Sequence, residues 1–175
     1  CINLYSLCSF SGTSYEICEN SATLPGFNGL VSSFTNIYSE PLLFFSGGNC
    51  TGSIFSFKSE SSCLSASTIS ARMINNIKSV VFTSRDIPKE GCINVYDFAC
   101  HSGSKVEQIC DNEVDLSTIG WSNKISSIKL NRVGFVSITV FTGPNFTGSS
   151  STINNDRYNL SFTFENKIRS IRFNR

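Results

Sequence analysis

Apolar and polar residues alternate in two stretches that open the two halves of the chain. The first is CINLYSLCSFSGTSYEIC (1–18), and the second is CINVYDFACHSGSKVEQIC (92–110). Each begins with an alternating run, INLY or INVY, and a period of two is typical of a β-strand with one buried face. A Ser-Gly step follows in both, and glycine favours a turn because it reaches positive φ without a Cβ clash. Each stretch is therefore predicted to form a β-hairpin.

The remainder of each half repeats in the same order. LLFFSGGNCTGS (42–53) corresponds to TVFTGPNFTGS (139–149), and NNIKS (75–79) is aligned with ENKIR (165–169). Each half also repeats within itself, as a strand, a hairpin with glycine, a Ser/Thr-rich segment and a closing strand. The closing strands are expected at 30–34, 77–82, 125–130 and 168–173. The pattern indicates four repeats of roughly 40 residues.

No segment has a sustained apolar period of 3.6 residues, so long helices are not expected. Short strands between Gly, Asn and Ser turns favour paired antiparallel sheets with Greek-key connections. The fold class is therefore predicted to be all-β, with two tandem Greek-key β-sandwich domains at 1–84 and 92–175. The segment 85–91 between them is charged and contains Pro and Gly, which is typical of a linker.

The composition narrows the classes of partner. The chain has 175 residues, of which 40% are hydrophobic and 15% are charged, enough to bury one or two cores. Mean hydropathy is +0.01, and no apolar run approaches the ~20 residues of a membrane span, so no membrane insertion is expected. A net charge of +1 argues against nucleic acid as a partner.

Eight cysteines at repeated spacings suggest an oxidising compartment. The sequence starts at Cys1 without Met, and we expect a processed protein that is secreted and extracellular. Sequons for N-glycosylation begin at Asn49, Asn145 and Asn159. Because Asn49 and Asn145 occupy the same place in the two halves, we expect exposed loop tips and a glycoprotein.

Residue numbers in an antiparallel hairpin predict which cysteines face each other. Counting back from the turns places Cys1 opposite Cys18 and Cys92 opposite Cys110, and facing residues lie near the span of a disulfide. Both pairs are therefore predicted. Cys50 and Cys63 occur only in the first half and most simply pair with each other.

Cys8 and Cys100 then remain, at hairpin tips that the alignment treats as equivalent. An odd cysteine in a secreted domain suggests a disulfide between molecules, which would produce self-association. A rival scheme pairs Cys8 with Cys18 and Cys100 with Cys110. A further alternative is a bond within the chain or a buried thiol.

The hairpins run from an aromatic residue to a glycine in all four repeats. They span Tyr5–Gly12, Phe45–Gly52, Tyr96–Gly103 and Phe141–Gly148, with a serine in each closing strand. In this respect the whole chain resembles the βγ-crystallin superfamily. The resemblance implies two wedge-shaped sandwich domains and no enzymatic activity, and it leaves the function open because the fold serves many roles.

The resemblance also implies a calcium motif, Asn/Asp-Asn/Asp-x-x-Ser/Thr-Ser, in each Greek key. In the family, the position-five hydroxyl of one motif cooperates with the position-two side chain of its domain partner. Applied to windows starting at 28, 75, 122 and 165, this pairs Ser32 with Asn76 and Ser126 with Asn166. The remaining combinations, Ser79 with Gly29 and Arg169 with Asn123, lack a side chain or place a cation in the site.

We therefore predict at most one Ca²⁺ per domain. The side-chain ligands would be neutral, which favours weak binding, about 10⁻⁴–10⁻³ M. The alternative is that these Asn and Ser side chains only bind turn backbone.

No catalytic or zinc motif is found. His101 is the single histidine and is expected in a solvated hairpin tip, and Trp121 is expected in the core. No Cys-x-x-Cys pair exists, which disfavours zinc. We therefore expect a non-enzyme.

The leading hypothesis is a secreted structural glycoprotein of a coat, extracellular matrix or filament, weakly Ca²⁺-binding and disulfide cross-linked. One alternative is a Ca²⁺-dependent adhesin or lectin-like module with a glycan or cell-surface ligand. The other is a defence toxin or inhibitor, which the near-neutral charge does not favour.

Overall fold

The computed structural model describes residues 1–27, 29–65 and 74–175, which divide into two compact units, Cys1–Arg85 and Asp86–Arg175. The boundary falls in the segment expected as a linker. Arg85 is fixed to the first unit, where its Nε lies 2.6 Å from Oε1 of Glu40. Pro88 is fixed to the second unit, because its carbonyl accepts a bond from Asn131 at 2.9 Å. No helix of the described segments is long and apolar enough to cross a membrane.

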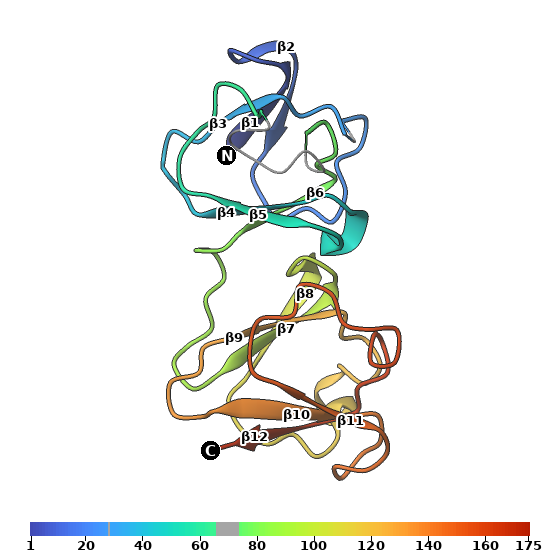
Figure 1. The fold of residues 1–175 in the computed structure, drawn as a ribbon. Helices are drawn as coiled ribbons and strands as arrows, with labels where there is room; N and C mark the ends of the chain where they lie inside the picture. The colour runs from blue at the N-terminus through green and yellow to red at the C-terminus, as the bar shows by residue number, and fades with distance from the viewer. Residues whose placement is uncertain (28, 66–73) are drawn as a thin grey trace. The chain divides into compact units, whose positions relative to one another are not determined.

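The first unit contains two three-stranded antiparallel sheets, in the orders β2-β1-β3 and β5-β4-β6 (Figure 1). Its elements are β1 (Ile2–Leu7), β2 (Ser11–Ile17), β3 (Ser33–Thr35), β4 (Leu42–Phe45), the 3₁₀ turn η1 (Gly48–Cys50), β5 (Ile54–Phe57) and β6 (Ser79–Phe82).

The second unit repeats this arrangement, with sheets β8-β7-β9 and β11-β10-β12. Its elements are β7 (Ile93–Phe98), β8 (Ser102–Ile109), the 3₁₀ turn η2 (Leu116–Ile119), β9 (Ser127–Leu130), β10 (Ser137–Phe141), β11 (Ser150–Ile153) and β12 (Ser170–Asn174). The predicted all-β fold is confirmed.

The two sheets of each unit exchange a short extended segment. In the first unit Ser21, which follows β2, pairs with Val80 of the other sheet, and Ser61, which follows β5, pairs with Phe34. The second unit has the same exchange, at Glu113 with Ile171 and at Arg157 with Ile128. Each sheet is thus completed by the other half of its unit, which is a Greek-key connection. Neither half can close its sheet without the other.

Each unit has its own apolar core between its sheets. The alternation seen in the sequence places Ile2 and Leu4 of β1 against the core of the first unit, and Ile93 and Val95 of β7 against that of the second. Each is at most 1% exposed, and burying one such side chain contributes about 1.5–3 kcal/mol. Trp121 lies in the second core, as its sequence context predicts.

A buried serine fixes each of the four hairpins. Its hydroxyl accepts a backbone N–H from the hairpin tip at 3.1 Å and donates to a hairpin carbonyl at 2.6–2.7 Å. The serines are Ser33, Ser79, Ser127 and Ser170, and the N–H groups belong to Phe10, Cys50, His101 and Phe146. Two successive tip residues have positive φ in every hairpin, so the tip folds back over the sheet. These serines give a common register for the four repeats.

Candidate functional site

Three oxygen atoms of the first unit converge just before β3. The hydroxyl oxygen of Ser32 lies 2.8 Å from the carbonyl oxygen of Ser6 and 3.2 Å from Oδ1 of Asn75. Asn75 has φ of 50°, a left-handed conformation that asparagine tolerates better than most residues. A serine hydroxyl has one proton and can donate it to only one of the two acceptors at a time. The hydroxyl oxygen and the other acceptor then face each other without a proton between them. A hard cation bound there would relieve their repulsion.

The second unit contains the same pair of side chains. The Ser126 hydroxyl lies 3.2 Å from Oδ1 of Asn166, whose φ is 52°. Backbone bonds hold both partners, because Leu160 N–H donates to the Ser126 carbonyl and Asn166 N–H donates to the Ile125 carbonyl, each at 2.9 Å. Ser126 is buried and Asn166 is exposed, so the pair can be reached from solvent on the Asn166 side. The structure brings together these two residues as the sequence predicts.

The assignment of Asn76 is wrong by one residue. Asn75 precedes the buried Ser79 by four positions, as Asn166 precedes Ser170, and Asn75 is the residue beside Ser32. The sequence alignment matched Asn76 with Asn166 because two asparagines are adjacent. Ser79, expected at position five, instead fixes the hairpin through Gly47 and Cys50. Counting back from the closing serines would have found the correct register.

In each unit the other pairing of motif positions, position two of the first motif with position five of the second, is unsuited to a cation. A Cβ on Gly29 would lie 2.7 Å from the Asn75 carbonyl oxygen, so a side chain there has no room. The correct register puts Lys78 at position five opposite it. In the second unit Arg169 stands at this position, with Nη2 3.7 Å from Oδ2 of Asp115. Bonds from Ser117, aided by Arg169, lower the pKa of Asp115 and keep it ionised. Asn28, the start of the first window, lies outside the described residues.

All eight cysteines are disulfide-bonded. Cys1 is joined to Cys18 and Cys92 to Cys110, with Cα atoms 3.9 Å and 4.1 Å apart, and these are the pairs given by the hairpin count. The rival pairs of Cys8 with Cys18 and of Cys100 with Cys110 do not form. All eight bonded cysteines suit the oxidising compartment that the sequence predicts.

The expected bond between Cys50 and Cys63 is wrong, because Cys63 is joined to Cys8 across a separation of 55 residues. Ser9 N–H donates to the Ser62 carbonyl, and this bond brings the first hairpin tip to the segment after β5. Cys8 is therefore not left over for a bond between molecules. Cys50 and Cys100 are both disulfide-bonded. The matching bond in the second unit is from Cys100 N–H to Tyr158, so Cys100 is equivalent to Ser9 and not to Cys8.

One cluster of metal-ligating residue types occurs in the described part of the chain, formed by Cys1, Glu16 and Cys18. Its two sulfur atoms are bonded to each other, so they are not thiolate ligands. His101 is not the solvated residue that the sequence predicts. It is 2% exposed, its ring stacks on Tyr96 with centroids 5.1 Å apart, and burial lowers its pKa to about 3. It is enclosed and neutral at pH 7, which does not suit a general base.

The sequon asparagines Asn49 and Asn145 are exposed at hairpin tips with φ of 54° and 52°. The hydroxyls of Thr51 and Thr147 donate to hairpin carbonyls at 2.7 Å and 2.6 Å. Ser11 and Ser102 make the same bond in the other two hairpins. The hairpin itself therefore favours Asn at the tip and Thr two residues later, so their repetition is not independent support for glycosylation. Asn159 is half-buried and precedes the loop that leads to Asn166.

The sequence resembled βγ-crystallins in its four hairpins and in the serine of each closing strand, and the structure contains both features. The all-β fold, with four small antiparallel sheets, resembles that of βγ-crystallin Greek-key domains. Similar solved structures include a βγ-crystallin from Ciona intestinalis, with 20% identity and TM-score 0.42, which covers 47% of this chain and 99% of its own. A βγ-crystallin domain from Flavobacterium johnsoniae has 24% identity and TM-score 0.41, over 46% of this chain and 91% of its own.

The calcium complex of Protein S has 18% identity and TM-score 0.40, and the match covers 98% of both chains. No protein-family model matches the sequence, and no curated protein matches it. The likenesses concern the fold alone.

Proposed function

We propose that this protein is a secreted structural protein that binds one Ca²⁺ in each unit. The observation that supports this best is the repeated pair of oxygens, Ser32 with Asn75 and Ser126 with Asn166, each 3.2 Å apart. The two pairs occupy the same place in the two units. The fold by itself does not require a Ser–Asn pair at this place. The other pairing of motif positions holds Gly29 with Lys78 in the first unit and Asn123 with Arg169 in the second.

The available ligands are hydroxyl, amide and carbonyl oxygens, which are the donors that Ca²⁺ prefers. In the first unit Ser32, Asn75 and the Ser6 carbonyl would hold the ion, and in the second unit Ser126 and Asn166 would hold it, with water completing each shell. No carboxylate belongs to either set, so we expect weak affinity, about 10⁻⁴–10⁻³ M.

The bound ion would stabilise the folded units instead of transmitting a signal. At a Ca²⁺ concentration ten times the Kd, one site adds about 1.4 kcal/mol to the free energy of unfolding. Such concentrations occur only where Ca²⁺ is millimolar, which agrees with an extracellular setting.

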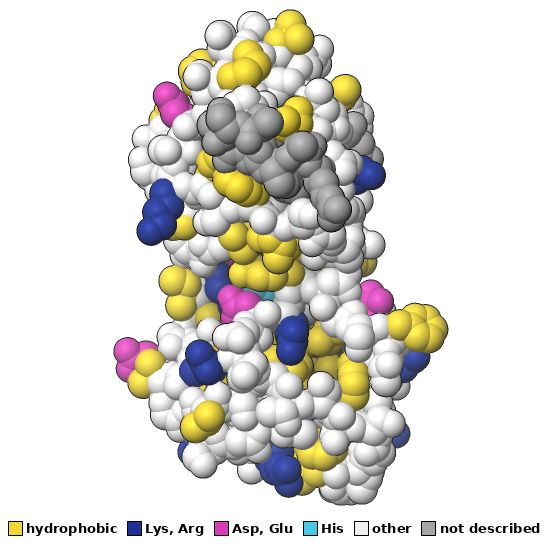
Figure 2. All heavy atoms as spheres, viewed as in Figure 1, with side chains coloured by type: hydrophobic (Ala, Val, Ile, Leu, Met, Phe, Trp, Pro, Cys, Tyr) yellow, Lys and Arg dark blue, Asp and Glu magenta, His cyan; other side chains and the backbone are white. Residues whose placement is uncertain are grey.

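Two further properties support a structural role. One disulfide joins the two ends of the opening hairpin in each unit, and a third disulfide joins Cys8 to Cys63. Charged side chains are scattered over the visible face without a patch of one sign (Figure 2), and the net charge is +1. Weak repulsion between molecules permits dense packing in a coat or matrix. Glycans at Asn49, Asn145 or Asn159 would make it a glycoprotein.

Calorimetric titration of the full chain with CaCl₂ tests the proposal. Asn75→Gly and Asn166→Gly should each remove one binding event, because glycine keeps the positive φ and deletes the amide oxygen. Asn123→Gly is the matched control at the equivalent position beside Arg169, and it should bind as the parent does. Absence of heat in the parent at millimolar Ca²⁺, or equal loss in all three variants, would contradict the site assignment.

A further inference from the structure

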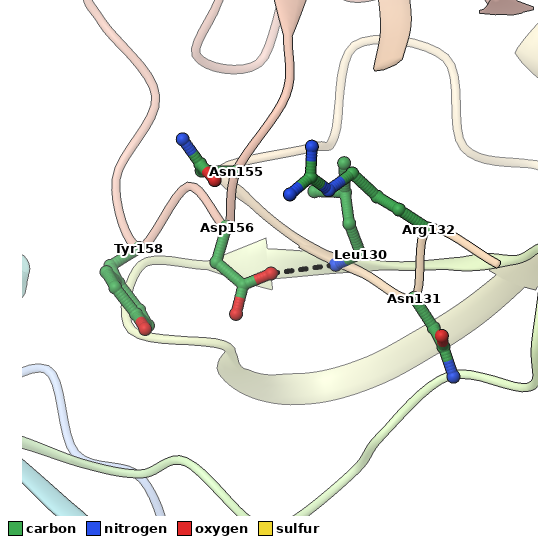
Figure 3. Close-up of a pocket in the computed structure, with 6 residues that line it drawn as sticks. All are labelled: Leu130, Asn131, Arg132, Asn155, Asp156 and Tyr158. Carbon is green, nitrogen blue, oxygen red and sulfur yellow. Dashed lines mark hydrogen bonds between the residues drawn. The ribbon is translucent and has the colours of Figure 1, made fainter. Parts of the chain in front are cut away.

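A polar hollow of about 440 Å³ lies in the second unit, and neither Ser126 nor Asn166 is among its lining residues. Its walls are two segments, Leu130–Arg132 at the end of β9 and Asn155–Tyr158 after β11 (Figure 3). The volume is within the range of sites for small ligands. It is lined mainly by planar polar side chains, unlike the apolar pockets that bind most drug-like molecules.

Hydrogen bonds hold the two walls of the hollow together in the absence of a ligand. Oδ1 of Asp156 accepts the Leu130 N–H at 2.9 Å, drawn as the dashed line in Figure 3. The backbones of Ile128 and Arg157 exchange two bonds of 2.9 Å and 2.8 Å. The Asn131 side chain is turned away from the hollow and donates to the Pro88 carbonyl. Prior fixation of this kind lowers the entropic cost of binding.

Three side chains offer hydrogen bonds to the hollow, those of Arg132, Asn155 and Asp156, and Tyr158 also lines it. The guanidinium of Arg132 extends toward Asn155, above Asp156 (Figure 3). Burial raises the pKa of Tyr158 to about 12, so its hydroxyl keeps its proton at neutral pH. The lining therefore combines donors from Arg132 and Asn155 with acceptors from Asp156 and Asn155.

The charge of the lining decides the class of ligand. Asp156 interacts with two cations, Lys129 and Arg132, and Lys129 interacts in turn with Asp86, so the charges around the hollow cancel. Each charge disfavours an ion of its own sign. An anion would be repelled by Asp156, and a cation by Arg132. A neutral molecule with several hydroxyls can donate to Asp156 and accept from Arg132 at once. We propose that this hollow is a binding site for a neutral sugar.

The fold does not require this lining. The first unit forms the same strand pair, between Phe34 and Ser61, yet the positions of Arg132, Asp156 and Tyr158 are taken there by Tyr38, Glu60 and Ser62. The first unit thus keeps a carboxylate at this place but has no arginine at the position of Arg132. The proposal is also independent of Ca²⁺, because neither Ser126 nor Asn166 lines the hollow.

The test is a titration of the ¹⁵N-labelled full chain with galactose, mannose and N-acetylglucosamine, followed by NMR in the presence of a Ca²⁺ chelator. At least one neutral sugar should shift the amide signals of Arg132, Asn155 and Asp156 in a saturable manner. Glucuronate and inorganic phosphate, run in parallel, should bind more weakly because they are anions.

Two substitutions and one control locate the site. Arg132→Ala and Asp156→Asn should each lower the affinity roughly ten-fold, the loss expected for one charged hydrogen bond. Asp156→Asn retains an oxygen for the Leu130 N–H, so the frame is kept. Arg172→Ala removes another exposed arginine of this unit and should leave the affinity unchanged.

Three results would overturn the proposal. The first is no saturable shift with any neutral sugar up to about 100 mM, a concentration far above a millimolar Kd. The second is tighter binding of phosphate than of every neutral sugar, which would identify an anion site. The third is sugar binding that Arg132→Ala and Asp156→Asn do not alter.

Discussion

The backbone N–H of Phe146 donates to the hydroxyl oxygen of Ser170, 3.1 Å away, and the same hydroxyl donates to the Gly143 carbonyl at 2.7 Å. Ser170 is fully buried, and one side chain thus satisfies two backbone groups of a hairpin tip. Equivalent bonds occur in all four repeats, so the fold depends on a serine that the core packing does not reveal.

Replacing this serine should destabilise the second unit. Ser170→Ala leaves a partly buried N–H and a partly buried carbonyl without their serine partner, which we expect to cost roughly 1–3 kcal/mol. Equilibrium unfolding in guanidinium chloride measures this loss. Ser150→Ala, on an exposed position of β11, is the control and should change stability by less than about 0.5 kcal/mol. Equal effects of the two substitutions would show that the hydroxyl bonds are unimportant.

His101 should make the protein less stable in mild acid. Its pKa is about 3 when folded and near 6.5 when unfolded, so the unfolded chain binds more protons between these values. Stability therefore falls as pH falls from about 6.5 to about 3, by up to roughly 5 kcal/mol. His101→Phe removes this titration and places at the hairpin tip the residue found at Phe10 and Phe146.

Denaturation midpoints at pH 7 and pH 4 give the test. We expect the parent to lose much more stability than His101→Phe between these pH values. The Ile128 carbonyl, which contacts the His101 ring in the parent, still accepts a hydrogen bond from the Arg157 N–H in the variant. The substitution therefore leaves this carbonyl with a donor. A parent and variant with the same acid dependence would mean that His101 is already protonated or solvated.

The bond between Cys8 and Cys63 should contribute more stability than that between Cys1 and Cys18. It closes a loop of 55 residues against 17, and loop entropy predicts about 4 and about 3 kcal/mol respectively. Unfolding of the Cys8→Ala/Cys63→Ala and Cys1→Ala/Cys18→Ala double variants gives the comparison. Non-reduced peptide mapping should recover Cys8 linked to Cys63, and a peptide linking Cys50 to Cys63 would contradict the bond.

The sequon at Asn145 can be separated from the hairpin that contains it. Asn145→Gly should remove any glycan from secreted material and keep the positive φ, with little change in stability. Thr147→Val should remove the same glycan and also cost about 1 kcal/mol, because the bond to the Pro144 carbonyl is lost. Intact mass and thermal unfolding report the two effects. An unchanged mass in both variants would mean that Asn145 is not glycosylated.

The sequence alone determined the repeat structure. Alternation at Ile2 and Leu4, the glycine-ended hairpins and the spacing of Cys1 and Cys18 depend on neighbours within one strand pair, so local pattern was sufficient. The Ser126–Asn166 pair was implied by the resemblance to βγ-crystallins, applied to the repeated windows.

Tertiary structure alone decided the contacts between repeats. Asn75 and Asn76 are adjacent in sequence, and the buried, hairpin-fixing role of Ser79, which only the structure shows, gives the register in which Asn75 lies beside Ser32. Cys8 meets Cys63 because the segment after β5 crosses to the first hairpin tip, a contact that no count along one hairpin contains. The polar hollow is formed by residues about 25 positions apart, and only the pairing of Ile128 with Arg157 brings its two walls together. Long-range pairing depends on the packing of the whole unit, and local sequence does not encode it.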